Sequence, residues 1–225
     1  MEKLVKGILE FRRNLSPEVR ESFAKLALGQ KPDVLFVACS DSRVVPNLFA
    51  STNPGDLFVV RNVGNLVPSW EELGAGKGDS SVGAALEFSV GALKVKDIVI
   101  CGHSECGAMQ ALIEKPVNSE MPYLSSWLKN GLPAMKEKKL PLQETPGLSQ
   151  ANRLSQLNVL MQIQHLRTYP FIRSALRKGV LRIHGWWFDI HNAEVHAYKS
   201  GIQSFVLMDE KEVENTLLDL ENTNA

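Results

Sequence analysis

The sequence predicts an α/β fold in which helices flank a mainly parallel central β-sheet. Three short apolar segments, residues 34–38, 57–60 and 98–101, have the length and composition of strands buried on both faces. A helical pattern at residues 80–93 separates the second segment from the third, and such alternation is typical of parallel strands joined by helical crossovers. Hydrophobic residues make up 44% of the chain and charged residues 22%, which is ordinary for a globular protein.

The N-terminal segment predicts a helical arm ahead of this core. Apolar residues recur at helical spacing from Leu4 to Leu15. Ser16 and Pro17 then have the character of an N-cap and a first-turn proline, so a second helix should begin here and stop at Gly29. The apolar stripe of this arm packs either on its own domain or on a partner subunit.

The rest of the chain continues the alternation of helices and strands. A helix should begin at Gly107, and helical patterns dominate residues 123–139 and 149–178. Residues 180–190 and 203–208 are strand-like. No linker divides the chain, so we expect one domain.

Charge and cysteine content restrict the class of protein. The chain has 25 Lys and Arg against 25 Asp and Glu, and this balance argues against a generic partner such as nucleic acid or an anionic membrane. No apolar run approaches the length of a membrane span, and the N-terminus lacks the apolar core of a secretory signal. Three cysteines are too few for a disulfide framework. We therefore expect a cytoplasmic protein with reduced thiols.

Two cysteines and a histidine suggest a metal site. His103 and Cys106 are spaced so that both side chains can face one point across a strand-to-helix turn, and Cys39 follows another predicted strand. Ligands of such sheets sit at the carboxyl ends of the strands. Two sulfurs and one ring nitrogen suit zinc and leave a fourth position open for water. Cys101 is the rival of Cys39 as the third ligand, although its place in an apolar run favours a buried hydrophobe.

Asp41 and Arg43 follow Cys39 closely. On an extended strand end they would point the same way and form an ion pair. Such a pair is either a surface contact worth less than about 1 kcal/mol or a device that holds the carboxylate off the metal. In the second case the carboxylate would accept a hydrogen bond from zinc-bound hydroxide and orient it.

The segment Cys39–Arg43, followed by His103–Cys106, resembles the signature of the β-class carbonic anhydrases. Residues 54–62, 84–88 and 184–187 resemble further family segments at similar spacing. The resemblance covers residues 30–208, so it includes most of the chain.

The resemblance implies a zinc enzyme with one zinc ion per chain. Its ligands would be Cys39, His103 and Cys106, with Asp41 and Arg43 as a catalytic dyad. The activity implied is reversible hydration of CO2 to bicarbonate and a proton by a zinc-bound hydroxide. Two thiolates cancel the zinc charge, so the bound water should have a higher pKa than in a three-histidine site and activity should rise toward alkaline pH.

The resemblance also implies an assembly. Family members are homodimers, homotetramers or larger, their N-terminal helices embrace a neighbouring subunit, and the active site lies near the dimer interface. We therefore expect a single domain over residues 1–225, with an arm at 1–29, a core at 30–208 and a C-terminal tail at 209–225.

The family has two kinds of site. In one, bicarbonate occupies an inhibitory pocket lined by Trp, Arg and Tyr; here Phe36 and Phe188 replace the two aromatic residues, and only Arg61 matches. The open, plant-like kind is favoured instead. The substrate-pocket positions of that kind of site correspond to Gln30, Phe58, Val63 and Phe88. At the last of these, Phe88 replaces a tyrosine.

Two alternatives remain at this point. A similar scaffold can hydrolyse CS2 or COS, which would give little CO2 hydration and would release sulfide. A non-catalytic zinc or bicarbonate-sensing module would need a closed fourth metal position. A glycine-rich segment at residues 74–80 superficially resembles a phosphate loop, but its spacing does not fit that motif.

Overall fold

The fold is built on one six-stranded sheet with the strand order β2-β1-β3-β4-β5-β6. The computed structural model describes residues 1–224 except 72–79, 115–119 and 138–139, so the glycine-rich segment lies largely outside the described residues. Strands β2, β1, β3 and β4 are parallel, and the last two pairings are antiparallel. The strands are β1 Val34–Cys39, β2 Leu57–Asn62, β3 Asp97–His103, β4 Arg182–Asp189, β5 Glu194–Lys199 and β6 Ser204–Leu207.

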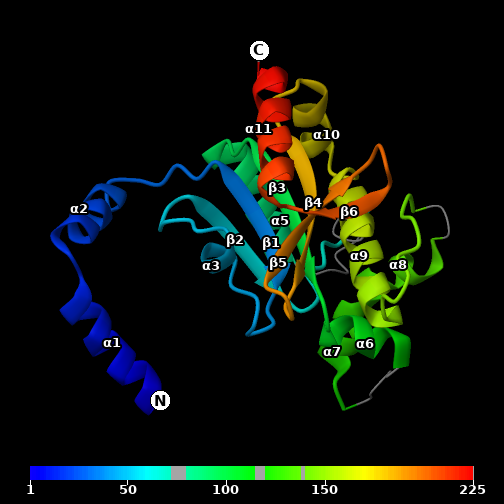
Figure 1. Cartoon of the computed structure of the whole chain (residues 1–225), viewed down its shortest axis with the longest axis horizontal. Coiled ribbons are helices and arrows are strands. Elements are labelled where there is room, and N and C mark those ends of the chain that lie inside the picture. Colours follow the sequence, from blue (N-terminus) through cyan, green and yellow to red (C-terminus); the bar gives the residue numbers. More distant parts are fainter. Residues whose placement is uncertain (72–79, 115–119, 138–139, 225) are drawn as a thin grey trace.

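Helices flank this sheet, and the predicted α/β class with a mainly parallel sheet is confirmed (Figure 1). A π-helical segment, Phe88–Leu93, follows α5, and a short 3-10 segment, Lys129–Gly131, joins α7 to α8. The α-helices are α1 Glu2–Asn14, α2 Pro17–Leu26, α3 Pro46–Phe49, α5 Ser80–Glu87, α6 Gly107–Glu114, α7 Pro122–Leu128, α8 Leu132–Lys136, α9 Gln150–Leu166, α10 Pro170–Arg177 and α11 Glu210–Asn224.

The core lies on both faces of the central strands. Successive side chains of a strand point to opposite faces. Leu35 and Ile98 therefore pack in one cluster with the helix residue Leu166, whereas Phe36 and Val99 pack in another on the opposite face. Burial on both faces explains why these strands appear in the sequence as continuous apolar runs.

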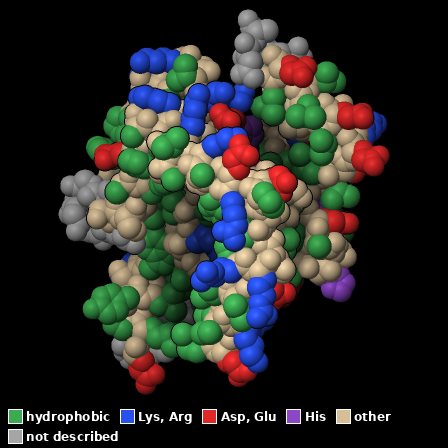
Figure 2. Space-filling view, turned by 90° about the vertical axis from the view of Figure 1, so that its left-hand side faces the viewer, with side chains coloured by type: hydrophobic (Ala, Val, Ile, Leu, Met, Phe, Trp, Pro, Cys, Tyr) green, Lys and Arg blue, Asp and Glu red, His purple; other side chains and the backbone are tan. Residues whose placement is uncertain are grey.

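The N-terminal arm extends away from the rest of the molecule (Figure 1). Ser16 caps α2 as predicted, since its Oγ accepts a hydrogen bond from the Val19 N–H. Phe11 of α1 and Phe23 of α2 meet with ring centroids 6.4 Å apart, yet no residue of either helix is buried. Figure 2 views the molecule from this side and shows hydrophobic side chains gathered among lysines and arginines. The arm thus presents uncovered apolar surface.

Three features of the structure differ from the sequence prediction. The strand β5 was not predicted, and the segment treated as a C-terminal tail contains α11. The helix predicted over residues 80–93 changes to π-helical form at Phe88 and ends at Lys94, whose φ of 58° is left-handed.

Among the described residues, no helix has both the length and the apolar composition that a membrane crossing requires.

A charged cluster joins the amino ends of β3 and β4. The Asp97 carboxylate accepts two hydrogen bonds from Arg182, at 2.7 and 2.8 Å, and lies 2.7 Å from His184 Nε2. Burial alone would raise the pKa of Asp97, but the hydrogen bonds from Arg182 and His184 outweigh it and lower the pKa to about 2. This carboxylate therefore favours the folded state when it is ionised.

Asp97→Asn is expected to lower the free energy of unfolding by about 2 kcal/mol at neutral pH. A depressed folded-state pKa contributes stability above the unfolded value, 3.8, and this contribution is lost as the pH falls through about 2. Urea denaturation at several pH values should therefore show the two proteins converging below about pH 4. An undiminished difference near pH 2.5 would contradict this account.

Asp33→Asn is a suitable control for that measurement. Asp33 pairs with Lys96 at 3.4 Å, but both side chains are about two-thirds exposed. An exposed ion pair adds little to stability, so this variant should unfold like the unaltered chain at every pH.

Candidate metal centre

Three potential ligands meet at the carboxyl ends of two neighbouring strands. Cys39 ends β1, His103 ends β3, and Cys106 precedes α6. Because β1 and β3 are parallel neighbours, their carboxyl ends lie side by side. The ligand atoms of the three residues lie within 4.8 Å of one another. The side chains are 5%, 0% and 1% exposed, respectively.

The turn after β3 brings Cys106 back toward His103. Glu105 has a left-handed φ of 54°, which reverses the chain within two residues. Asn152 of α9 holds this turn: its Oδ1 accepts from the Glu105 N–H at 2.7 Å, and its Nδ2 donates to Glu105 Oε1 at 3.0 Å. The strained turn is therefore fixed by a side chain from a distant helix.

His103 presents a free ring nitrogen to the group. Its Nδ1 lies 2.8 Å from the Ser104 carbonyl oxygen, so Nδ1 carries the proton and donates it. In the neutral ring the lone pair is then on Nε2, which is buried with no hydrogen-bond partner among the described residues. A buried nitrogen lone pair without a partner beside two thiols is what a metal ion would satisfy.

The two thiols are electrostatically unequal. The pKa of Cys39 is lowered mainly because Cys106 donates to its sulfur, and the backbone N–H groups of Gly64 and Asp41 lower it further. The pKa of Cys106 is raised by its hydrogen bond to Cys39, which stabilises the protonated thiol, and by burial. Cys39 therefore carries the first thiolate, and a dication bound here would also displace the proton from Cys106.

Cys101 does not join this group. It is fully buried in β3, and its thiol donates to the Gly102 carbonyl at 3.4 Å. Burial raises the pKa of Cys101, which is typical of an inert structural thiol. Of the two cysteines considered from sequence, the structure brings Cys39 to His103 and Cys106.

Asp41 and Arg43 form a two-pronged ion pair next to the thiols. Arg43 Nε donates to Asp41 Oδ1 at 2.9 Å, and Nη2 donates to Oδ2 at 2.8 Å. The pair forms within a turn and not on an extended strand end, so that detail of the sequence prediction was wrong. The Arg43 guanidinium holds the pKa of Asp41 well below its usual range. Arg43 also donates to the Glu105 carbonyl at 3.0 Å, which ties the two ligand-bearing loops together.

A model of one protein family matches residues 34–195, and its description is carbonic anhydrase. This match spans the three potential ligands and the ion pair. The chain belongs to the β-carbonic anhydrase family.

Curated relatives and solved structures support this assignment. A carbonic anhydrase of Synechococcus elongatus is 40% identical, over 87% of this chain and 70% of the relative. One from Pseudomonas aeruginosa is 38% identical over 93% of both chains. The structure of the β-carbonic anhydrase CcaA has a TM-score of 0.82 and 37% identity, and the match covers 92% of this chain and 98% of that one. A tetrameric β-carbonic anhydrase of Sordaria macrospora matches with a TM-score of 0.69 and 30% identity over 87% and 92% of the two chains.

The positions compared with the family's bicarbonate pocket are occupied by packed rings. Phe36 is buried and lies 5.8 Å from the Trp186 ring, and Phe188 stacks on Phe49 at 4.6 Å. Arg61 instead binds backbone: it donates to the carbonyl of Cys39 at 3.0 Å and to that of Asp41 at 2.6 Å. These rings offer no hydrogen bond to an anion.

The four substrate-pocket residues compared with the family lie in three places. Phe58 and Phe88 form one ring pair, with centroids 5.8 Å apart. Val63 is 42% exposed and immediately precedes Gly64, whose N–H points at Cys39. Gln30 is exposed, between α2 and β1. Within a single chain the structure therefore leaves Gln30 and these apolar side chains partly open to the outside.

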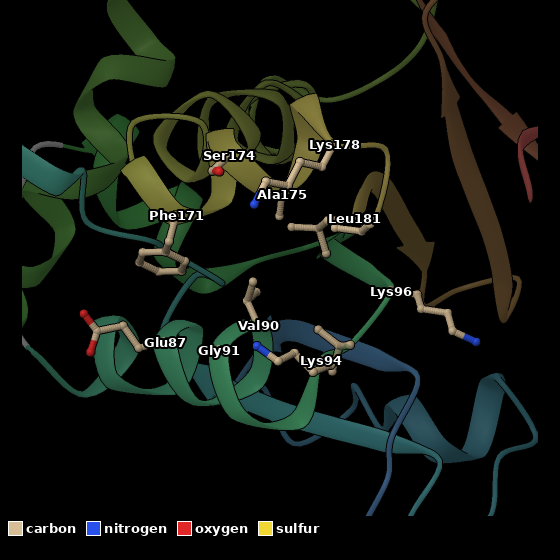
Figure 3. A pocket seen from close by; sticks show the side chains of 12 residues that line it. Glu87, Val90, Gly91, Lys94, Lys96, Phe171, Ser174, Ala175, Lys178 and Leu181 are labelled. Carbon is tan, nitrogen blue, oxygen red and sulfur yellow. The ribbon is translucent and has the colours of Figure 1, made fainter.

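A cavity of about 740 Å³ lies elsewhere in this β-carbonic anhydrase (Figure 3). Val90 and Lys94 line it from the π-helical side, and Phe171, Ala175 and Lys178 line it from α10. It opens near the amino ends of β3 and β4, whereas the potential ligands lie at carboxyl ends. Because it lies at the opposite end of the sheet from the potential ligands, this cavity is not the candidate metal centre.

Sequence reasoning missed the polar face of α9. Asn152 holds Glu105, Ser155 exchanges hydrogen bonds with the His103 backbone, and Asn158 donates to the Gly64 carbonyl. These residues recur at helical spacing among apolar neighbours. Amide side chains that recur at helical spacing within an apolar helix need hydrogen-bond partners once they are buried. This pattern is the signal in the sequence that could have identified these residues.

Proposed function

We propose that this chain catalyses reversible hydration of CO2 to bicarbonate and a proton with one zinc ion held by Cys39, His103 and Cys106. The observation that carries the proposal is the convergence of two thiols and an unpartnered imidazole nitrogen within 4.8 Å, in a member of the carbonic anhydrase family. Three protein ligands would leave the open position of a catalytic zinc site. No observation favours hydrolysis of CS2 or COS, or a sensing role.

The chain's own residues would orient the nucleophile. Zinc, when bound, supplies a Lewis acid that lowers the pKa of a water molecule in its open position. Asp41 Oδ1 accepts from both the backbone N–H and Nε of Arg43, whereas Oδ2 accepts one hydrogen bond, from Arg43 Nη2. A carboxylate oxygen has room for a second donor, so Oδ2 is the atom that would accept a hydrogen bond from the O–H of the nucleophile.

Substrate binding would depend on apolar contact and one amide. CO2 carries no net charge, so the rings of Phe58 and Phe88 and the side chain of Val63 suit it. The Gln30 amide would donate a hydrogen bond to an oxygen of CO2 or bicarbonate from across a subunit boundary. The packed rings at Phe36 and Phe188 support the open kind of site, without an inhibitory bicarbonate pocket.

We also propose that copies of this chain associate into a homodimer or homotetramer. The uncovered apolar face of α1 supports this, and a structural relative is described as tetrameric. The chain would form one domain, with the arm at 1–29, the core at 30–208 and the tail at 209–225. Its three unpaired cysteines suit a reducing compartment such as the cytoplasm.

Stopped-flow CO2 hydration by zinc-loaded protein is expected to show catalysis that rises from about pH 6.5 to about pH 9. Chelation should abolish the rate, and added zinc should restore it. Asp41 stays ionised throughout this range because its pKa is depressed, so the rise would report another group. One zinc per chain without catalysis at any pH would refute the proposed function. A steep acid-side loss deepened by bicarbonate would refute the open site alone.

A further inference from the structure

The backbone of Gly64 donates a hydrogen bond to a potential metal ligand. The Gly64 nitrogen lies 3.3 Å from Cys39 Sγ and donates its hydrogen to that sulfur. A donor to a thiolate withdraws electron density that the sulfur would otherwise give to a metal. The direction of this one N–H therefore affects how strongly Cys39 would bind and neutralise zinc.

We propose that Asn158 of α9 is a positioning residue that aims the Gly64 N–H at Cys39. Asn158 Nδ2 donates to the Gly64 carbonyl at 3.0 Å, and Asn158 is 1% exposed. Gln162 Nε2 donates to Asn158 Oδ1 at 2.8 Å, which fixes the orientation of the Asn158 amide. The inference rests on the proposed zinc site.

The conformation of Gly64 shows why such a contact is needed. Gly64 has a left-handed φ of 81°, and a Cβ added there would approach the Ala108 Cβ to 3.0 Å. The loop is thus pressed against α6 at a residue that has wide conformational freedom. A hydrogen bond to the Gly64 carbonyl restricts rotation of the peptides on either side of its Cα atom.

The rest of the loop is held independently of Asn158. Trp127 Nε1 donates to the Val63 carbonyl at 2.7 Å, and Gln162 Oε1 accepts from the Val67 N–H at 2.8 Å. The Asn62 side chain accepts from the N–H of Leu66 and donates to its carbonyl. Loss of the Asn158 contact should therefore leave the loop in place and free the Gly64 peptide, which makes the effect local.

The same helix holds the other two ligand-bearing segments. Ser155 Oγ lies 2.8 Å from the His103 carbonyl and 3.2 Å from the His103 N–H. Asn152 holds the turn before Cys106, as described above. Helix α9 packs along β3 and β4 (Figure 1), so one rigid element fixes the backbone beside all three potential ligands.

The test uses the full chain loaded with cobalt(II), whose thiolate charge-transfer absorption reports the donor strength of cysteine sulfur. Asn158→Ala is expected to move this band to longer wavelength, because a thiolate without its N–H donor gives up an electron more easily. Tyr169→Phe is the matched control: Tyr169 is buried and donates to the Pro68 carbonyl at 2.8 Å, and its loss should leave the band unmoved.

An unmoved band in folded Asn158→Ala would overturn the inference, even if zinc affinity fell. If that variant does not fold, Asn158→Leu tests the same contact, because Leu fills a similar volume and cannot donate to the Gly64 carbonyl. An unmoved band there would be equally decisive. A wild-type protein with no thiolate band at all would instead refute the proposed zinc site.

Discussion

Replacement of Cys39, His103 or Cys106 by alanine is expected to release most of the zinc and to reduce CO2 hydration by more than about 100-fold. Loss of an outer partner of a metal ligand typically costs 10- to 100-fold, and loss of a ligand itself should cost more. Each variant leaves two protein donors, too few for a stable zinc site. Zinc per chain after exhaustive dialysis and the stopped-flow rate are the measurements.

Cys101→Ala is the matched control for this series. Cys101 is a buried cysteine two residues before His103 on the same strand, but it lies outside the group of potential ligands. This variant should retain zinc and turnover despite some loss of stability from the smaller side chain. Near-stoichiometric zinc in any of the three ligand variants would remove that residue from the coordination set.

Asp41→Asn is expected to retain zinc and to lower turnover by about 10- to 100-fold. The amide has nearly the shape of the carboxylate, but only one of its two terminal atoms accepts hydrogen bonds. The asparagine therefore cannot accept both hydrogen bonds from Arg43 at two oxygens and also accept one from the nucleophile. The rate at saturating CO2 and the zinc content should be measured on the same samples.

Asp97→Asn provides a control of the same chemistry at the other end of the sheet. Asp97 also accepts two hydrogen bonds from one arginine, so the substitution breaks an equivalent ion pair. It should reduce stability and leave turnover unchanged, whereas Asp41→Asn should lower turnover. Equal turnover in Asp41→Asn and the unaltered protein would exclude Asp41 from the mechanism.

The sequence was most informative where burial left a clear pattern. The strands β1 and β3 are apolar without interruption because both faces are covered. Cys39 and His103 could then be placed at strand ends on one edge, which is the main step toward the group of potential ligands. The N-cap at Ser16 was predictable because it depends on neighbouring residues alone.

Features that depend on distant contacts were not predictable in this way. β5 pairs with β4 on one side and β6 on the other, and its short mixed sequence gives little periodic signal. The turn at Asp41 lets Arg43 reach both its neighbour and the Glu105 carbonyl, a contact that no local pattern encodes. The sequence of α9 does not indicate which groups its amide side chains contact. Their role is apparent only from the backbone of distant segments to which they form hydrogen bonds.

The N-terminal arm has a consequence for how this protein responds to dilution. Its helices have 13 and 10 residues and bury no side chain within the chain, and isolated helices of that length are marginal in water. Their order is therefore tied to whatever covers their apolar face. If that cover is a second copy, mass action couples helix content to protein concentration. Dilution would then loosen the arm while the central sheet stayed intact, and an enzyme that draws Gln30 from its neighbour would lose specific activity at the same concentrations.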